Sequence, residues 1–106
     1  MFVLEDAQHA LDRGVVALAE LAGYGSTCDA YHRVQIAPDV EEPVRPMRLA
    51  MADAGVSAEA IEYINLHGTG TILNDRLETA AVRKCFGSHA DRIPCSSTKS
   101  SHIACR

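Results

Sequence analysis

Residues 61–100 hold the pattern that most restricts what this chain can fold into. Two short apolar runs, residues 61–66 and 93–97, are separated by a stretch of helical character. The first run leads into His67 and a glycine-rich turn, and the second leads into Lys99. Strands joined by a helical crossover run parallel, so both runs should end at the same edge of one sheet, where sites are usually built. We therefore expect the His67 ring and the Lys99 ammonium to lie within roughly 10 Å of each other.

The same alternation of apolar runs and helical stretches extends over the whole chain, which predicts an α/β fold with right-handed crossovers. The predicted elements are a strand ending at Leu4, a helix over 6–13, a buried strand over 15–21, an irregular stretch over 26–43, a helix from Val44 or Arg45 to Ala54 with Pro46 in its first turn, a strand over 61–66, a helix from Asp75 to about Phe86, and a strand over 93–97.

Several side chains receive structural predictions from their spacing. Met47 and Met51 lie on one helical stripe and are expected in the core. Ser57 is expected to cap a short turn that runs to Ala60. Asp75 and Glu78 have the spacing of a capping box, with Asp in place of Ser or Thr. Cys95 lies inside the last predicted strand and is expected to be a core thiol, whereas His32 is expected in a surface loop.

Composition excludes several classes of function. The net charge of −4 provides no basic surface for nucleic acid. No apolar run reaches the roughly 20 residues of a membrane span, and Glu5 and Asp6 interrupt the first one. The four cysteines lack metal or redox spacing, which predicts reduced thiols in a cytoplasmic protein and no metal. A small metal-binding module is the alternative, with Cys85 and His89, or His102 and Cys105, as ligand pairs.

Three motifs occur in a specific order: His-Gly-Thr-Gly-Thr over 67–71, Asn-Asp and Glu-Thr over 74–79, and Ser-Ser-Thr-Lys-Ser over 96–100. Together they resemble the β-ketoacyl-acyl carrier protein synthases of the type II group, to which polyketide ketosynthase domains are close relatives. Gly-Tyr-Gly over 23–25 and Asp-Ala-Tyr-His over 29–32 agree with this resemblance. It implies a partial thiolase-like layered fold, with helices covering mixed sheets. It also implies that residues 1–106 are a partial C-terminal ketosynthase domain, truncated at both ends.

The resemblance assigns roles to individual residues in a decarboxylative Claisen condensation. That reaction needs a thiolate for the acyl chain and donors for the enolate oxygen, and a neutral imidazole suits the second task. His67 is implied as the donor to the malonyl thioester oxygen, and Lys99 as an active-site residue that supports a second histidine. Thr69 and Thr71 are implied to hold the phosphopantetheine arm, although they can instead satisfy turn amides.

Glu78 is expected to support this site as the charge partner of Lys99. Helix capping is the competing explanation, and both roles can hold at once. The sequence departs from the family pattern after Lys99. His102 follows the lysine by three positions instead of five and is preceded by Ser101 instead of glycine. His102 is either the second catalytic histidine with an altered loop or part of an end shifted out of register. The nucleophilic cysteine motif of the family is absent from the chain.

The predicted function is therefore that of a fragment of an acyltransferase, a β-ketoacyl-acyl carrier protein synthase of fatty-acid or polyketide synthesis. Its implied partners are acyl and malonyl thioesters, the acyl carrier protein and a second subunit in a homodimer. It needs no cofactor of its own, because the carrier delivers phosphopantetheine. The alternative is a non-catalytic remnant or interaction fragment. In either case we expect exposed apolar surface, self-association and no condensation by the isolated chain.

Overall fold

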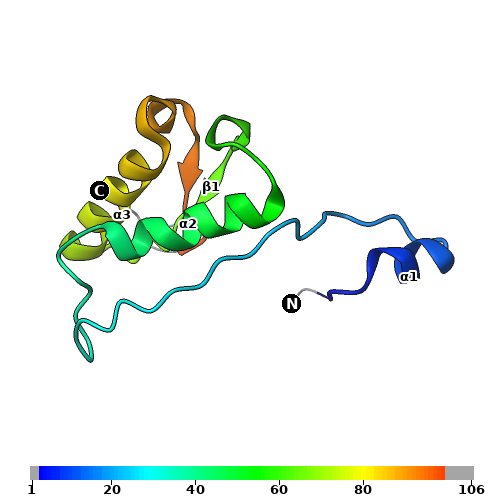
Figure 1. Ribbon diagram of the computed structural model, residues 1–106, viewed down its shortest axis with the longest axis horizontal. Coiled ribbons are helices and arrows are strands. Elements are labelled where there is room, and N and C mark those ends of the chain that lie inside the picture. Colours follow the sequence, from blue (N-terminus) through cyan, green and yellow to red (C-terminus); the bar gives the residue numbers. More distant parts are fainter. Residues whose placement is uncertain (1–2, 100–106) are drawn as a thin grey trace.

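The computed structural model describes residues 3–99. Figure 1 shows a body in which helices lie beside a small sheet, and an N-terminal arm whose short helix lies apart from it. We call residues 3–30 the arm and residues 41–99 the body. In chain order the elements are α1 (Ala7–Asp12), α2 (Glu41–Ala54), the 3-10 helix η1 (Ala58–Ala60), β1 (Ile64–Asn65), α3 (Ile72–Phe86), the 3-10 helix η2 (Gly87–Arg92) and β2 (Cys95–Ser96).

The two strands pair in parallel, as the sequence predicts, although each is shorter than expected. Ile64 is opposite Cys95, and Asn65 is opposite Ser96. The pairing is extended by backbone bonds from Ile64 N to Pro94 O (3.1 Å) and from Leu66 N to Ser96 O (2.7 Å). Helix α3 connects the strands, so both of them end on the same side of the sheet. This arrangement confirms the α/β prediction for the second half of the chain.

The core of the body lies between the helices and one face of the sheet. Val82 and Phe86 from α3 pack with Ile93, and all three are buried. Met47 and Met51 pack against this cluster, which confirms the predicted methionine stripe. The other partly buried members are Ala58, Ile61, Ile64, Leu66, Cys85 and Ala90.

The opposite face of the sheet is open in the described part of the chain. Tyr63 is 53% exposed, and its hydroxyl lies 2.5 Å from Ser96 Oγ. Asn65 is also exposed. Cys95 pairs with Ile64 and therefore belongs to the face that carries the core, yet it is exposed as well. The prediction that Cys95 is a core thiol is therefore wrong. Both strands of a two-stranded sheet are edge strands, so a position inside a strand is not necessarily buried, even on the covered face.

Helix α2 begins at Glu41, three or four residues before the predicted start, and Pro46 lies inside it instead of in its first turn. A proline inside a helix leaves the carbonyl four residues earlier without its usual donor. That carbonyl belongs to Glu42, and it accepts a hydrogen bond from Thr27 Oγ1 at 3.3 Å. A side chain of the arm thus compensates for Pro46. At the other end Gly55 adopts the left-handed conformation and terminates the helix, as predicted.

The arm lies along α2 as an extended chain. A side chain on Gly23 would approach Ala50 O to 2.4 Å, and one on Gly25 would approach Pro46 O to 2.2 Å. Tyr24 N also donates to an Asp53 carboxylate oxygen at 3.0 Å. These contacts, with that of Thr27, run antiparallel to the helix. The arm contacts α2 so closely because glycine has no side chain.

The predicted buried strand over 15–21 does not form. Val16 is 90% exposed and Leu18 is fully exposed. The strand predicted to end at Leu4 is also absent, and Leu4 is 76% exposed. A strand needs a neighbouring strand for its backbone bonds, and a doubly buried strand needs a covering layer on each face. The described residues supply neither to these segments.

The exposed arm enlarges the molecule. The radius of gyration is 16.2 Å, whereas a compact chain of this length has about 13 Å. The accessible surface is 8499 Å², compared with about 5,800 Å² expected for a folded protein of this mass. The exposed apolar surface predicted from the sequence is confirmed by large side chains such as Leu4, Val16 and Leu18, which are mostly or fully exposed.

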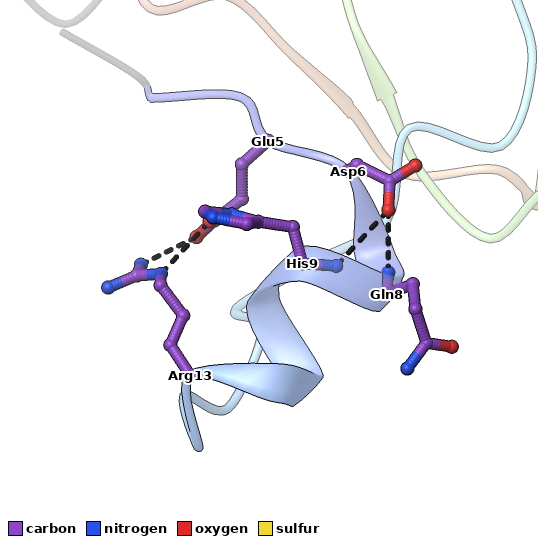
Figure 2. Close-up of polar contacts among 5 residues, drawn as sticks. All are labelled: Glu5, Asp6, Gln8, His9 and Arg13. Carbon is purple, nitrogen blue, oxygen red and sulfur yellow. Dashed lines mark hydrogen bonds and ion pairs between the residues drawn. The ribbon is translucent and has the colours of Figure 1, made fainter.

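Helix α1 confirms the predicted helix over 6–13, and its own side chains hold it. Asp6 caps the helix, since its Oδ1 accepts from Gln8 N (2.9 Å) and His9 N (3.1 Å). The Glu5 carboxylate bridges Arg13 Nη2 (2.7 Å) and His9 Nδ1 (2.8 Å), as Figure 2 shows. The Arg13 and His9 hydrogen bonds lower the pKa of Glu5.

Two predicted caps are wrong. Ser57 precedes η1, but its side chain makes no capping bond. Helix α3 begins at Ile72 and is capped by Thr71, whose Oγ1 accepts from Asn74 N at 3.3 Å. The capping box of Asp75 and Glu78 therefore does not form. The spacing was correct for a cap, but the helix starts earlier and leaves Glu78 free for other contacts.

Candidate active site

The carboxyl ends of β1 and β2 bring together the two residues that the sequence places at strand ends. His67 follows β1 and Lys99 follows β2. Lys99 Nζ lies 3.1 Å from His67 Nδ1. The predicted proximity is confirmed, and it is close enough for a hydrogen bond between the side chains. Both side chains are exposed, so an external ligand can reach them.

Glu78 stabilises the turn that carries His67. Its carboxylate accepts from the backbone nitrogens of His67 (2.6 Å) and Gly68 (2.9 Å), and from Asn74 Nδ2 (3.2 Å). Within residues 3–99 it forms no ion pair with Lys99, so the predicted charge partnership is wrong. The glutamate is nearly two helical turns into α3, and its side chain contacts the backbone of the His67 turn. Its support of the site therefore acts through the backbone.

Thr69 and Thr71 lie in the turn between His67 and α3. Their hydroxyl oxygens are 3.3 Å apart. Thr71 also caps α3, so the alternative that it satisfies a turn amide is confirmed for this residue. A helix cap uses one lone pair of the hydroxyl, which leaves its proton and second lone pair for another partner.

Two hollows flank the His67 turn. One, of about 340 Å³, is lined by His67, Asn74 and Glu78 at one end and by apolar side chains that include Met47 and Leu77. The other, of about 230 Å³, is lined by residues of both turns and of α3: Leu66, Gly68, Gly70, Asp75, Glu78, Thr79, Ser96 and Ser97. The turn is thus accessible from two sides.

The chain has other histidines besides His67. His102 lies outside the described residues. His32 is exposed in the loop that joins the arm to the body, as predicted. Its Nδ1 accepts hydrogen bonds from Val34 N and Gln35 N. Within residues 3–99 there is no group of three or more side chains suited to hold a metal.

None of the described cysteines has the setting of an activated nucleophile. Cys28 and Cys95 are exposed free thiols, and Cys85 packs in the core. Burial raises the pKa of the Cys85 thiol, only partly offset by Arg48. A raised pKa keeps the thiol protonated and therefore unreactive.

Sequence reasoning assigned no role to Ser97 or Asn74, which both contact this site. Ser97 Oγ donates to His67 O at 3.2 Å, and Asn74 donates to Glu78. Both residues lie within the motifs described above. Their position within these motifs was the signal that could have indicated a role at the site. Their hydrogen bonds could not be predicted, because these depend on how the two turns pack against each other.

Comparison with known proteins identifies the family. Residues 18–103 match the family model described as the C-terminal domain of beta-ketoacyl synthases. The chain belongs to this family. Nodulation protein E of Rhizobium sp. (strain N33) is 49% identical over 105 residues, covering 99% of this chain and 26% of that protein. The 3-oxoacyl-acyl-carrier-protein synthase 2 of Synechocystis sp. is 43% identical over 100 residues, covering 94% of this chain and 24% of that protein.

Solved ketosynthases have the same fold as this chain. One is a type II polyketide synthase ketosynthase, in complex with its acyl-carrier protein and bound to the hexaketide. It superposes with a TM-score of 0.85 at 38% identity, over 91% of this chain and 24% of that one. The partial thiolase-like fold predicted from the sequence is thereby confirmed, although the sheet of the described residues is parallel and not mixed. The chain spans about a quarter of the length of the relatives it matches.

Proposed function

We propose that this beta-ketoacyl synthase segment binds a malonyl thioester and stabilises the enolate formed when the malonyl group loses carbon dioxide. The observation that supports this most strongly is the 3.1 Å contact between Lys99 Nζ and His67 Nδ1. An ammonium group has only donors, so Nδ1 must accept and the ring proton lies on Nε2. His67 thus keeps a neutral N–H that can donate to a thioester oxygen as it becomes negative.

Loss of carbon dioxide leaves the electron pair of the broken C–C bond in the enolate. Donation from His67 Nε2 stabilises that charge without transferring the proton. In the complete condensation the enolate carbon attacks an acyl thioester carbonyl, and a cysteine thiolate leaves. We place that cysteine outside these 106 residues. We also propose His102 as the second catalytic histidine.

The turn after His67 supports the proposed binding of the substrate. Thr69 and Thr71 offer hydroxyls beside that histidine, where a phosphopantetheine arm would reach it. We propose an acyl carrier protein as the partner that delivers the arm, so the protein itself needs no cofactor. The similar ketosynthase in complex with its acyl-carrier protein supports this partner. A homodimer is proposed for the longer protein.

The pathway is proposed only as fatty-acid or polyketide synthesis, because relatives of both kinds are similar to the chain. We propose a cytoplasmic location. The free thiols Cys28, Cys85 and Cys95 support it, since they suit a reducing compartment. In the described residues no helix has the length and apolar character to cross a membrane.

Release of labelled carbon dioxide from malonyl-acyl carrier protein tests the proposal. The chain should accelerate this release without condensing an acyl thioester. His67→Ala should abolish the acceleration, and His67→Gln should keep part of it because its amide also donates. His9→Ala is the matched control, since His9 lies in α1, away from the site. An equal rate for the parent chain and His67→Ala would exclude the proposal.

A non-catalytic role as an interaction fragment is the second candidate. The exposed apolar side chains of the arm, among them Val16, Leu18 and Leu21, favour it. The same assay separates the candidates, because an interaction fragment would not release carbon dioxide.

A further inference from the structure

Ser97 joins the two turns of the site. It is 8% exposed and is the buried polar residue of the described chain. Its Oγ donates to His67 O at 3.2 Å and accepts from Lys99 N at 3.2 Å. One hydroxyl therefore contacts the backbone of both residues whose side chains form the His67–Lys99 pair.

Gly68 provides the space that this serine occupies. Its φ is +51°, a conformation that other residues rarely adopt. A side chain there would place its Cβ 2.4 Å from Ser97 Cβ and 2.5 Å from Ser97 Oγ. The turn after His67 is thus fitted to Ser97 on one side, while Glu78 holds its backbone nitrogens through a separate contact.

We propose that Ser97 is a positioning residue, which holds the His67 ring against the Lys99 ammonium. This role rests on the proposed function, in which Lys99 fixes the proton of His67 on Nε2. The side chains of His67 and Lys99 are exposed and would otherwise sample several rotamers, and ordering them costs conformational entropy. When the Ser97 hydroxyl fixes the backbone of both residues, less conformational entropy is lost as the two side chains come together.

The test measures coupling between His67 and Lys99 without using activity. Lysines of the full chain are labelled by reductive ¹³C-methylation, and the Lys99 signal is recorded by NMR. In the parent, His67→Gln should shift this signal. In the Ser97→Ala background the same substitution should shift it at least about threefold less, and exchange of the Lys99 amide should accelerate about fivefold, since one modest hydrogen bond is lost.

Ser96→Ala is the matched control. Ser96 is adjacent, but it is exposed and contacts Tyr63. It should leave both readouts unchanged. Ser97→Cys keeps a weak donor and acceptor and should retain part of the coupling. The NMR signals of Val82 and Phe86 report whether each variant is folded. If Ser97→Ala does not fold, the coupling measured in Ser97→Cys tests the positioning role. Unchanged coupling in both Ser97 variants would overturn the proposal.

The rate of malonyl decarboxylation tests whether the positioning by Ser97 affects the proposed reaction. Ser97→Ala should lower kcat for carbon dioxide release about fivefold with little change in KM, because the bond affects the geometry of the donor instead of substrate binding. If the parent chain releases no carbon dioxide, the proposed function is excluded. The positioning role of Ser97 is still tested, because the NMR coupling does not depend on activity.

Discussion

The arm and the body are stabilised in different ways. In the arm, α1 is held by contacts within nine residues of sequence, from Glu5 to Arg13. In the body, the pair of His67 and Lys99 is separated by 32 positions, and the core joins α2, α3 and Ile93. Local contacts suffice for a short helix such as α1, but only packing between distant segments brings reactive groups together.

The two regions also differ in what covers them. Phe86 is 8% exposed, whereas Leu18 is fully exposed, although both are large apolar residues. Equal hydrophobicity thus has unequal consequences, because a side chain stabilises the fold only where a neighbouring element covers it. The following predictions, from the largest effect to the smallest, test this contrast.

Phe86→Ala should lower the free energy of unfolding by about 3–5 kcal/mol, the usual range for a buried Phe. Urea denaturation followed by circular dichroism measures it. Leu18→Ala in the arm is the control and should change the unfolding midpoint little. Equal effects of both substitutions would contradict the contrast.

Glu78→Ala should destabilise the body by about 1.5–3 kcal/mol, because two backbone donors lose a charged acceptor. Hydrogen exchange of the His67 and Gly68 amides should accelerate more than that of core amides. Glu62→Ala, at an exposed position before β1, is the control. Exchange that accelerates uniformly over the body would argue against a specific role at this turn.

Thr27→Val should destabilise the attachment of the arm to α2 by about 1 kcal/mol, since the Glu42 carbonyl above Pro46 loses its donor. Exchange of amides in residues 23–27 is the measurement, with Ser26→Ala as the exposed control. If a second substitution, Pro46→Ala, restores a backbone donor, the effect of Thr27→Val should become smaller. A full effect in that background would show that the bond is not compensating for the proline.

Asp6→Ala should weaken α1 by about 0.5–2 kcal/mol, as expected for loss of an N-cap. The body should be unaffected, because α1 lies apart from it (Figure 1). NMR shifts of residues 7–12 measure the first effect, and the urea midpoint of the body measures the second. A lower midpoint would show that the arm and the body unfold together.

Acid should weaken α1 through Glu5. The Arg13 and His9 bonds lower the pKa of Glu5 in the folded state. A carboxylate with a lowered pKa contributes stability above its unfolded pKa, about 4.3, and loses it as the pH falls through the lower folded value. NMR shifts of residues 7–12 should therefore move toward coil values below about pH 4. In Glu5→Gln this part of the pH dependence should be absent.

Much of the body was predictable because its signals are local. The residues that end each segment, Gly55 and Gly87, and the methionine stripe of α2 specify helix positions without reference to the rest of the chain. The motifs around His67 and Lys99 placed both residues at strand ends, and parallel pairing then required them to be neighbours. The start of α2 was missed because Pro46 normally lies near a helix start, and the bond from Thr27 is invisible in the sequence.

The sequence by itself determined the family, the helices and the order of the two strands, because these depend on periodicity, turn residues and motif spacing. Only the tertiary structure decided which partner each side chain has. In the folded chain Glu78 accepts hydrogen bonds from the backbone of His67 and Gly68 instead of pairing with Lys99. Cys95 is exposed, and residues 15–21 form no strand. Burial and hydrogen bonding depend on what lies across the fold, which one segment does not encode.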